Sequence, residues 1–578
     1  MKGSKILIYL VLLSFCFIAV AYFGIQKNYA LTGDLLSAMS NVKEVSKVGF
    51  RAFDFTAQDF HNDAFFVIQN FFLRSDLIGL SRIHFTASVF SYLSEESSSI
   101  LTNLYFVGFL AIILFVFSSF LLYRSLFGSD RGALLFTILL LVLTEIPLIR
   151  WSGIISLHGL TYNFYLPQFF ALSFFFLSVY TTVEYLKNKS IKWIFFASFF
   201  SLVVILLHIL TGLFLILILI SIGAYCLFNN QRIIGRNIII GTLVSFILSH
   251  FWPLYSVLGF LSETNSYLIL VLSVGLSFLG IYVYGYLARM NNFKLPEMDL
   301  SKALILLLIF SIVMVQLVNS GILDSHLSFS QVNSWYLSFL PLLLAFVLIL
   351  PNFMNKGRGF LLFLILYWCA ISFGPYLLGY VGLPLKTYWR FLFFGKIPLV
   401  FLVSWAFDKV TERKKYIVLI YSLFVLLVFL FTFTNVVNSS VGRYYGNVPV
   451  EYKLPEVLVS SNVLVLSDPT TNYHLEGLTK NKVVSLPEDK VSDVDYEENI
   501  IRIGETYKML FDPLSNKDLL RTYSPKFILF NKKFNQEDVS DFTKISLDWS
   551  NASEISSSFD NFDIIYNDDN FILLESRK

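Results

Sequence analysis

Long apolar runs recur along the first three-quarters of the chain, from Ile6 to about Phe433. A helix that crosses a bilayer needs about 20 mostly apolar residues, and the runs divide into thirteen such segments. The run from Trp193 to Phe228 is too long for one crossing and is divided at the break His208–Gly212. The pattern predicts a polytopic α-helical membrane domain over residues 1–435, with spans at 5–25, 101–123, 132–149, 163–183, 193–209, 212–228, 237–258, 267–288, 303–320, 335–351, 359–380, 391–407 and 416–435.

Lysine and arginine are distributed unevenly between the segments that join these spans. Cytoplasmic loops are enriched in both residues, and with a cytoplasmic N-terminus the inner segments hold 18 of them and the outer segments 10. Six of the outer ten fall in one long loop, to which the charge rule does not apply. We therefore expect a multi-pass protein of the cell membrane with an extracytoplasmic C-terminus. The first segment, with Lys2, Lys5 and Ala19-Val20-Ala21, also fits a cleaved signal peptide, which would leave the remaining topology unchanged.

Two large regions lie outside the membrane in this topology. Residues 26–100 form a long first extracytoplasmic loop with amphipathic stretches, which we expect along the membrane surface. Residues 436–578 contain strand-like runs at 462–466, 482–486, 526–530, 562–566 and 571–575, the last two forming a hairpin. Asp468-Pro469 follows the first of these strands and opens a helical turn that ends at Leu478. The tail is predicted to be a small extracytoplasmic α/β domain.

Composition agrees with the membrane assignment and divides the charge between the two regions. Hydrophobic residues make up 56% and charged residues 14% of the chain, against about 25% charged in soluble domains. The net charge of +3 combines 28 basic and 17 acidic residues in 1–435 with 15 basic and 23 acidic residues in 436–578. The acidic tail excludes a basic nucleic-acid-binding segment. The three cysteines all lie in apolar runs, which excludes a disulfide framework and a cysteine metal site.

Few ionisable residues lie at membrane depth, where they are costly and often functional. Glu145 lies near the outer end of the third span and is followed by Arg150; the pair either anchors a helix end or lines a site. His208 and His250 lie at outer span ends, where each fits a structural hydrogen bond as well as a ligand contact. The choice between these roles stays open at this point.

Carboxylates are the candidate chemistry of the first outer loop. Asp34 follows the first span closely, so it is expected near the bilayer surface, facing a substrate that enters from lipid. Asp59 and Asp63 are four residues apart on one predicted helical face, with His61 between them. This pair either contacts a ligand or caps the helix that begins at Ala64. No compact Asp-x-Asp occurs in the loop, and the sequence leaves open whether a divalent cation, Mg or Mn, takes part.

Cations near the twelfth span are the other half of the candidate site. Lys386 and Arg390 share one helical face at its outer mouth, and Lys396 follows within the span. Such side chains either snorkel to lipid headgroups or bind an anionic group such as a lipid phosphate, for which arginine is well suited. Outer cations are scarce in this topology, which favours the phosphate.

Three local segments, together with the architecture, make the chain resemble the membrane glycosyltransferases with the GT-C fold, of the oligosaccharyltransferase and protein mannosyltransferase type. They are Thr32-Gly33-Asp34 after the first span, Tyr388-Trp389-Arg390-Phe391 at the start of a late span, and the tail segment Val463–Thr471 with Leu478-Thr479 and Val483-Val484. Such proteins have a large first outer loop that carries a catalytic acid, about thirteen spans and an extracytoplasmic C-terminal domain. The chain lacks Trp-Trp-Asp-Tyr-Gly, the acceptor-recognition motif of true oligosaccharyltransferases, so the resemblance does not extend to transfer onto Asn sequons.

The resemblance implies a sugar transfer at the outer membrane surface. The donor would be a polyprenyl-phosphate sugar held among membrane lipids, and the acceptor an extracytoplasmic glycan, lipid or protein. By this resemblance Asp34 is the base for the acceptor hydroxyl, Arg390 the partner of the departing phosphate, and Lys386 its assistant. Glu145 and Arg150 would line the same cavity, with His208, Asp59 and Asp63 as further candidate substrate contacts.

Two other functions fit the same sequence. One is a transporter or flippase of a lipid-linked saccharide, although such proteins often show two similar halves, which this sequence lacks. The other is a non-catalytic protein that holds an envelope-assembly complex together through its tail. The absence of compact catalytic motifs keeps both alternatives open.

Overall fold

The computed structural model describes two compact units of the chain, which are treated separately below. The helical unit comprises residues 1–23, 108–252 and 256–439, and the second unit comprises 24–107, 253–255 and 440–578. Within them the structure describes residues 3–26, 95–142, 160, 167–251, 299–306, 344, 347–354, 359–380, 392–412, 454–479, 481–486, 496–532, 534 and 547–577. The predicted spans at 267–288 and 416–435 and the first outer loop lie outside these ranges.

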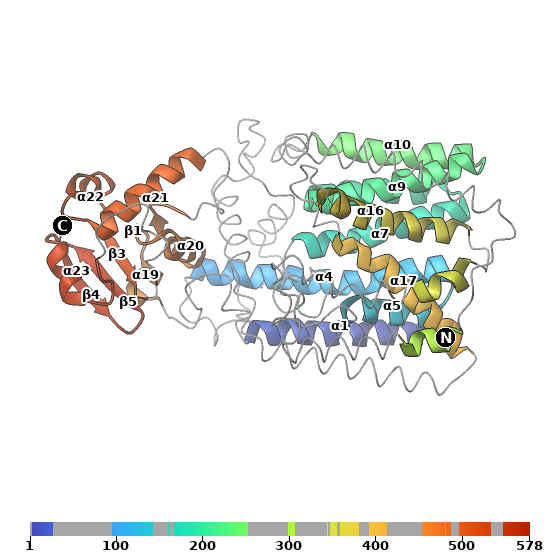
Figure 1. Cartoon of the computed structure of the whole chain (residues 1–578), viewed down its shortest axis with the longest axis horizontal. Coiled ribbons are helices and arrows are strands. Elements are labelled where there is room, and N and C mark those ends of the chain that lie inside the picture. Colours follow the sequence, from blue (N-terminus) through green and yellow to red (C-terminus); the bar gives the residue numbers. More distant parts are fainter. Residues whose placement is uncertain are drawn as a thin grey trace. The chain divides into compact units, whose positions relative to one another are not determined.

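Apolar helices make up the described part of the helical unit (Figure 1). Five helices among the described residues are long and apolar enough to cross a membrane, and each overlaps a predicted span. The total of thirteen spans stays a prediction, since several of them fall wholly or partly outside the described ranges. The helices are α1 (Gly3–Gln26), α4 (Glu95–Phe127), α5 (Asp130–Val142), α7 (Pro167–Asn188), α8 (Ile191–Leu207), α9 (Ile209–Phe228), α10 (Arg232–Ser249), α16 (Gly359–Tyr380) and α17 (Leu392–Thr411).

The predicted break in the long apolar run is confirmed at the junction of α8 and α9. His208 has an extended backbone (φ −158°) that ends α8 and begins α9. A Cβ atom at Gly212 would lie 2.7 Å from the Cα atom of Ile205, so glycine is required where α9 packs against the end of α8. The break therefore results from a polar residue at the turn and a small residue one turn later.

Aromatic rings fill the centre of the helical unit. Phe175 of α7, Phe214 of α9, Trp368 of α16 and Phe394 of α17 contact one another, and the rings of Phe214 and Phe394 stack with centroids 4.2 Å apart. Stacked and edge-to-face rings add about 0.5–1.5 kcal/mol per pair beyond the area that they bury. The cluster fixes four helices that are far apart in the sequence.

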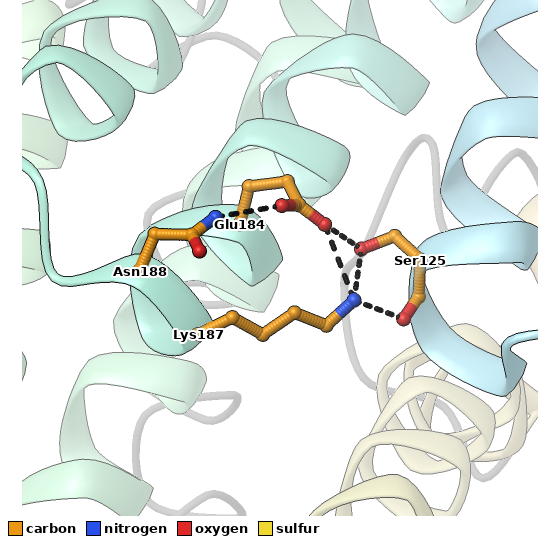
Figure 2. A network of polar contacts seen from close by, with 4 residues as sticks. All are labelled: Ser125, Glu184, Lys187 and Asn188. Atoms are coloured by element: carbon orange, nitrogen blue, oxygen red, sulfur yellow. Dashed lines mark hydrogen bonds and ion pairs between the residues drawn. The ribbon is translucent and has the colours of Figure 1, made fainter.

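A polar network joins the C-terminal ends of α4 and α7 (Figure 2). The carboxylate of Glu184 accepts hydrogen bonds from Ser125 Oγ at 2.6 Å and from Asn188 Nδ2 at 2.9 Å. Lys187 Nζ lies 3.1 Å from Glu184 Oε1 and also donates to Ser125. A single carboxylate thus holds two helix ends together.

A second polar contact lies at the same end of the unit. Ser129 Oγ donates to Asp408 of α17 at 2.7 Å and accepts from the backbone N–H of Gly132 at 3.0 Å, so it caps α5. Arg124 also pairs with Asp130 across the turn between α4 and α5. The ends of α4, α7 and α17 therefore meet at the start of α5. These are the helix ends that the charge pattern predicts to be cytoplasmic.

The C-terminal unit, which is the described part of the second unit from residue 454 onward, contains a five-stranded mixed sheet in the order β2-β1-β3-β5-β4. β1 (Leu464–Leu466) runs parallel to β2 (Lys482–Val483) and to β3 (Phe527–Asn531), while β5 (Phe571–Ser576) runs antiparallel to β3 and to β4 (Phe562–Asn567). Each of the five predicted strand segments overlaps one of these strands. The helices are α19 (Glu456–Ser460), α20 (Pro469–Leu478), α21 (Tyr496–Phe511), α22 (Lys517–Tyr523) and α23 (Ala552–Ser558).

Helices cover both faces of this sheet. Because β1 connects to β2 on one side and the chain then crosses back to β3 on the other, right-handed crossovers place α20 and α21 on opposite faces. On the α21 face, Phe511 and Phe530 pack on the buried ring of Trp549. On the other face, Asn531 at the end of β3 reaches Thr471 of α20. The parallel strands in the middle of the sheet, β1 and β3, are thus covered on both sides, whereas alternate residues of the edge strand β4 are exposed.

We predict that Glu184→Ala destabilises the helical unit by roughly 1 kcal/mol, since it removes the acceptor shared by α4 and α7. This value is lower than for a fully buried acceptor because Glu184 is partly exposed. The matched control is Glu412→Ala, because Glu412 pairs only locally with Lys409 and is more exposed. Thermal unfolding of both variants in detergent should show a lower midpoint for Glu184→Ala alone. Equal midpoints would show that the network adds nothing.

Candidate functional site

The described ranges include one of the eight residues that the sequence proposes for the site, His208. The other seven lie outside the described residues, and their roles stay predictions: Asp34, Asp59, Asp63, Glu145, Arg150, Lys386 and Arg390. The site is therefore built here from His208, from other polar groups of the helical unit, and from the polar groups of the C-terminal unit.

His208 caps the start of α9. Its Nδ1 atom accepts a hydrogen bond from the backbone N–H of Thr211 at 3.3 Å and lies 2.9 Å from Thr211 Oγ1. Because Nδ1 accepts this hydrogen bond, the proton of the neutral imidazole lies on Nε2. These contacts give His208 a structural role at the turn between α8 and α9. A contact of His208 with substrate stays a prediction.

Lys396 lies at the same end of the helical unit as His208. Phe214, near the start of α9, stacks on Phe394, near the start of α17, so the first turns of these two helices are neighbours. Lys396 follows Phe394 by two residues and is 3% exposed. Among the described residues of this unit, Lys396 and Asp408 are the buried charged side chains. Since α-helices rise 1.5 Å per residue, the two lie roughly 18 Å apart along α17.

A buried cation in an apolar helix bundle needs a polar or anionic partner, and such residues are commonly functional. The sequence placed Lys396 among the outer cations but gave no sign that its side chain is buried. Lys396 lies inside an apolar span with helical periodicity, five residues past the aromatic segment Tyr388–Phe391. This position is the sequence feature that could have indicated its burial.

In the C-terminal unit, a polar cluster lies at the carboxyl ends of β1 and β3. Ser467 Oγ donates to the backbone carbonyl of Leu529 at 2.6 Å, and Asp468 Oδ1 accepts from the N–H of Thr471 at 2.9 Å, which caps α20. Asn472 Nδ2 donates to the carbonyl of Ser467 at 2.9 Å. Because the chain leaves β1 toward β2 and later crosses back to β3, this is the switch point of the sheet, where α/β folds commonly bind ligands.

The polar atoms of this cluster are buried and bond mainly to one another. Burial raises the pKa of Asp468, while hydrogen bonds from Thr471 oppose that rise. Burial also lowers the pKa of His474, on α20, to about 4, so its ring is neutral at physiological pH. This arrangement orients the turn from β1 into α20. The sequence predicted the helical turn from Asp468-Pro469 but could not show the contacts of Ser467 and Asn531 with segments about 60 residues away.

No group of three or more His, Cys, Asp or Glu side chains suited to a metal ion occurs among the residues that the structure describes. The described cysteines are unpaired: Cys226 and Cys369 lie within helices of the bundle, and Cys16 lies on α1. The question of a divalent cation in the first outer loop falls outside the described ranges.

No protein-family model matches the chain, and no curated protein matches it. Among solved structures, the chain is similar to the crystal structure of the Archaeoglobus fulgidus oligosaccharyltransferase in the apo form. The sequence identity is 11% and the TM-score 0.48, and the similarity covers 92% of this chain and 70% of that chain. The GT-C fold and glycosyl transfer stay proposals for this chain.

We predict that the stability of the C-terminal unit depends on His474 below neutral pH. A folded-state pKa of about 4, below the ordinary 6.5, gives stability that is present above pH 6.5 and is lost as the pH falls toward 4, by roughly 3 kcal/mol in total. Asp468, whose pKa is raised, acts in the opposite direction, since its protonation in the folded state favours folding as the pH falls.

Comparison of the wild type with His474→Gln separates these two effects, because Asp468 is common to both proteins. Hydrogen exchange of the segment 464–483, corrected for intrinsic rates and measured between pH 7 and pH 4.5, should show a smaller loss of protection in the variant. An identical pH dependence of the two proteins would contradict the role of His474.

Proposed function

We propose that the chain is an integral-membrane glycosyltransferase of the GT-C type. It would move a sugar from a polyprenyl-phosphate donor in the membrane to an extracytoplasmic acceptor. The observation that carries this proposal is the combination, in one chain, of apolar helices of span length with a folded, acidic α/β unit, in the order that the family resemblance implies. The C-terminal unit would face the outside, where acceptors lie.

The proposed reaction breaks the bond between the anomeric carbon and the phosphate oxygen of the donor. The acceptor hydroxyl forms the new carbon–oxygen bond and passes its proton to Asp34, while the lipid phosphate departs with the electron pair of the broken bond. Arg390 would stabilise the charge that develops on that phosphate, assisted by Lys386, with Glu145 and Arg150 lining the same cavity.

Lys396 supports the proposed position of the phosphate. It follows Arg390 by six residues, and its buried ammonium lies at the end of the bundle where α9 and α17 both begin. A lysine there adds positive charge to the segment in which Arg390 and Lys386 are proposed to hold the phosphate. By the predicted topology this end faces outward, toward the leaflet that would hold the phosphate of the donor.

The direct test uses a radiolabelled polyprenyl-phosphate sugar and the purified full chain in liposomes. Transfer of the label to a water-soluble product, with release of polyprenyl phosphate, is the expected result. Movement of intact donor across the bilayer without release would identify a flippase. If neither transfer nor movement of the donor occurs with several sugars and acceptors, the result favours the non-catalytic assembly role.

We predict that Asp34→Asn lowers the rate of transfer at least about a hundredfold, since a positioned base contributes roughly 10²–10⁴ to the rate. Membrane insertion should be unaffected because Asp34 lies outside the predicted spans. Asp54→Asn, in the same loop and outside the proposed site, is the matched control and should retain far more activity. Full activity of Asp34→Asn in the liposome assay would remove Asp34 from the mechanism.

We predict that Arg390→Ala raises the KM for the lipid-linked donor about tenfold, the loss expected for a charge-assisted hydrogen bond to phosphate. Arg390→Lys should recover part of this loss, because it restores the charge but not the two-pronged contact. Steady-state kinetics at varied donor concentration measures both variants. An unchanged KM in Arg390→Ala would indicate that Arg390 only contacts lipid headgroups.

A further inference from the structure

A cavity of about 220 Å³ lies in the C-terminal unit, at the edge of the sheet where β3 and β4 begin and β5 ends. Its wall is formed by α22, by the turn from Ser558 to Phe562, and by Lys526 and Ser576. The switch-point cluster lies at the other end of β3, so the cavity is a separate site. Sites for drug-sized ligands occupy roughly 300–1,000 Å³, and this smaller cavity therefore suits a single small ring.

Cationic side chains outnumber carboxylates in the lining of the cavity. Lys517, Arg521, Lys526 and Asn561 present cationic or amide donors, and Asp560 is the carboxylate among the lining residues. The hydroxyl of Ser558 already donates to a backbone carbonyl of its own helix, so it adds an acceptor rather than a donor. A ligand that matches this lining carries more hydrogen-bond acceptors than donors, as a molecule with a carboxylate does.

Two of the three cations of the cavity are paired with neighbouring acids, and the third, Arg521, is 74% exposed. Lys517 Nζ lies 3.0 Å from Asp560, and Lys526 Nζ lies 2.9 Å from Glu575. The guanidinium of Arg521 reaches Asp518 only at 3.5 Å, and the side chain of Asp518 is 97% exposed. A pair so fully solvated contributes little, so Arg521 keeps most of its capacity to bind another carboxylate.

Apolar atoms form the rest of the lining. Leu520, Pro525 and Phe559 contribute to the wall, and Phe559 belongs to the hydrophobic core of this unit. Sugar rings combine an apolar C–H face with a polar edge of hydroxyls. A cavity with apolar groups beside charged donors and one carboxylate complements both parts of such a ring.

Backbone hydrogen bonds hold the wall in place. The N–H of Lys526 donates to the carbonyl of Leu464, the N–H of Ser576 donates to the carbonyl of Lys526, and the N–H of Arg577 donates to the carbonyl of Asn561, at 2.9–3.0 Å. These bonds tie the sheet edge to the turn at residues 558–562. The lining residues therefore start from fixed backbone positions, which lowers the entropy lost on binding.

We infer that this cavity binds an acidic saccharide residue, a sugar ring that carries a carboxylate. Arg521 receives the carboxylate, and the hydroxyls contact Asn561 and the Lys517–Asp560 pair. The acidic character of the ligand follows from the lining, whereas the choice of a saccharide rests on the proposed function, in which the C-terminal unit faces glycans outside the membrane. Nothing in the proposed transfer reaction requires this cavity.

The test is saturation-transfer NMR on the purified full chain in detergent, with methyl β-glucuronide as the probe and no donor present. We expect saturation of the glucuronide, and about tenfold weaker binding of methyl β-glucoside, which lacks the carboxylate. Equal affinity for the two sugars, or no saturation of either, would overturn the inference. Competition by acetate as strong as that by glucuronide would also overturn it, since a saccharide would then not be recognised.

Variants assign the binding to the cavity. Arg521→Gln should weaken glucuronide binding about tenfold. Arg502→Gln is the matched control, because Arg502 pairs with Glu498 on α21 and is absent from the lining; it should bind as the wild type does. Ser558→Trp, which fills the cavity from the end of α23, should abolish binding. Unchanged binding in Arg521→Gln and Ser558→Trp would place the sugar elsewhere.

The liposome assay separates this inference from the proposed function. Loss of glucuronide binding in Arg521→Gln, with transfer still measurable on a neutral acceptor, supports a separate binding site. Absence of binding in a wild-type protein that transfers sugar would overturn the cavity inference alone. Binding in a protein that transfers nothing would overturn the proposed function alone.

Discussion

The helical unit depends on hydrogen bonds from serine and threonine hydroxyls to neighbouring helices. Ser173 Oγ donates to the carbonyl of Ala111 on α4 at 3.1 Å, and the hydroxyls of Ser178 and Ser201 lie 2.9 Å apart between α7 and α8. A bilayer core offers no water, so each hydroxyl there must find a partner in the protein. The small side chains also let the helices approach closely. Interhelical contacts of this kind fix the relative positions of the helices, and thus of the charges at their ends.

The C-terminal unit separates structural polar groups from binding groups. The groups at the switch point, among them Asp468 and Asn472, are fully buried and orient the turn into α20. At the opposite edge, Arg521 and Lys526 face a cavity and keep partial exposure. A binding group must stay accessible to a ligand, whereas the side chains of Asp468 and Asn472 are closed off from solvent. The cavity is therefore the better candidate for ligand binding in this unit.

Within the described ranges the sequence predicted the helices and strands well, because apolar length and alternation depend on local composition. It placed the ends of the helices less well. The predicted span 163–183 differs from α7, which begins at Pro167 and ends at Asn188. Proline is favoured in the first turn of a helix, and the polar network of Glu184 and Lys187 extends α7 beyond its apolar part. Tertiary contacts decided that end, and a hydropathy window contains no information about them.

The candidate sites show the same limit more clearly. Periodicity placed Lys396 within a span, but its burial depends on which face of α17 packs against the neighbouring helices. The cavity of the C-terminal unit brings together residues from 513 to 576, so no local motif could indicate it. By contrast, Asp468-Pro469 was a reliable sign, since an N-cap acid followed by proline acts within a single turn.

The two buried charges of α17 both stand against the dipole of their helix. Asp408 lies near its C-terminus, the negative end, and Lys396 lies near its N-terminus, the positive end. At Asp408 the structure provides the compensation, since Ser129 donates to the carboxylate and at the same time caps α5, whose N-terminus is positive. The same electrostatic argument applies to Lys396 at the N-terminal end of α17, where a positive side chain lies near the positive end of the helix dipole. A buried ammonium at the positive end of a helix likewise needs a polar or negative partner, so both buried charges of α17 depend on groups outside the dipole of their own helix.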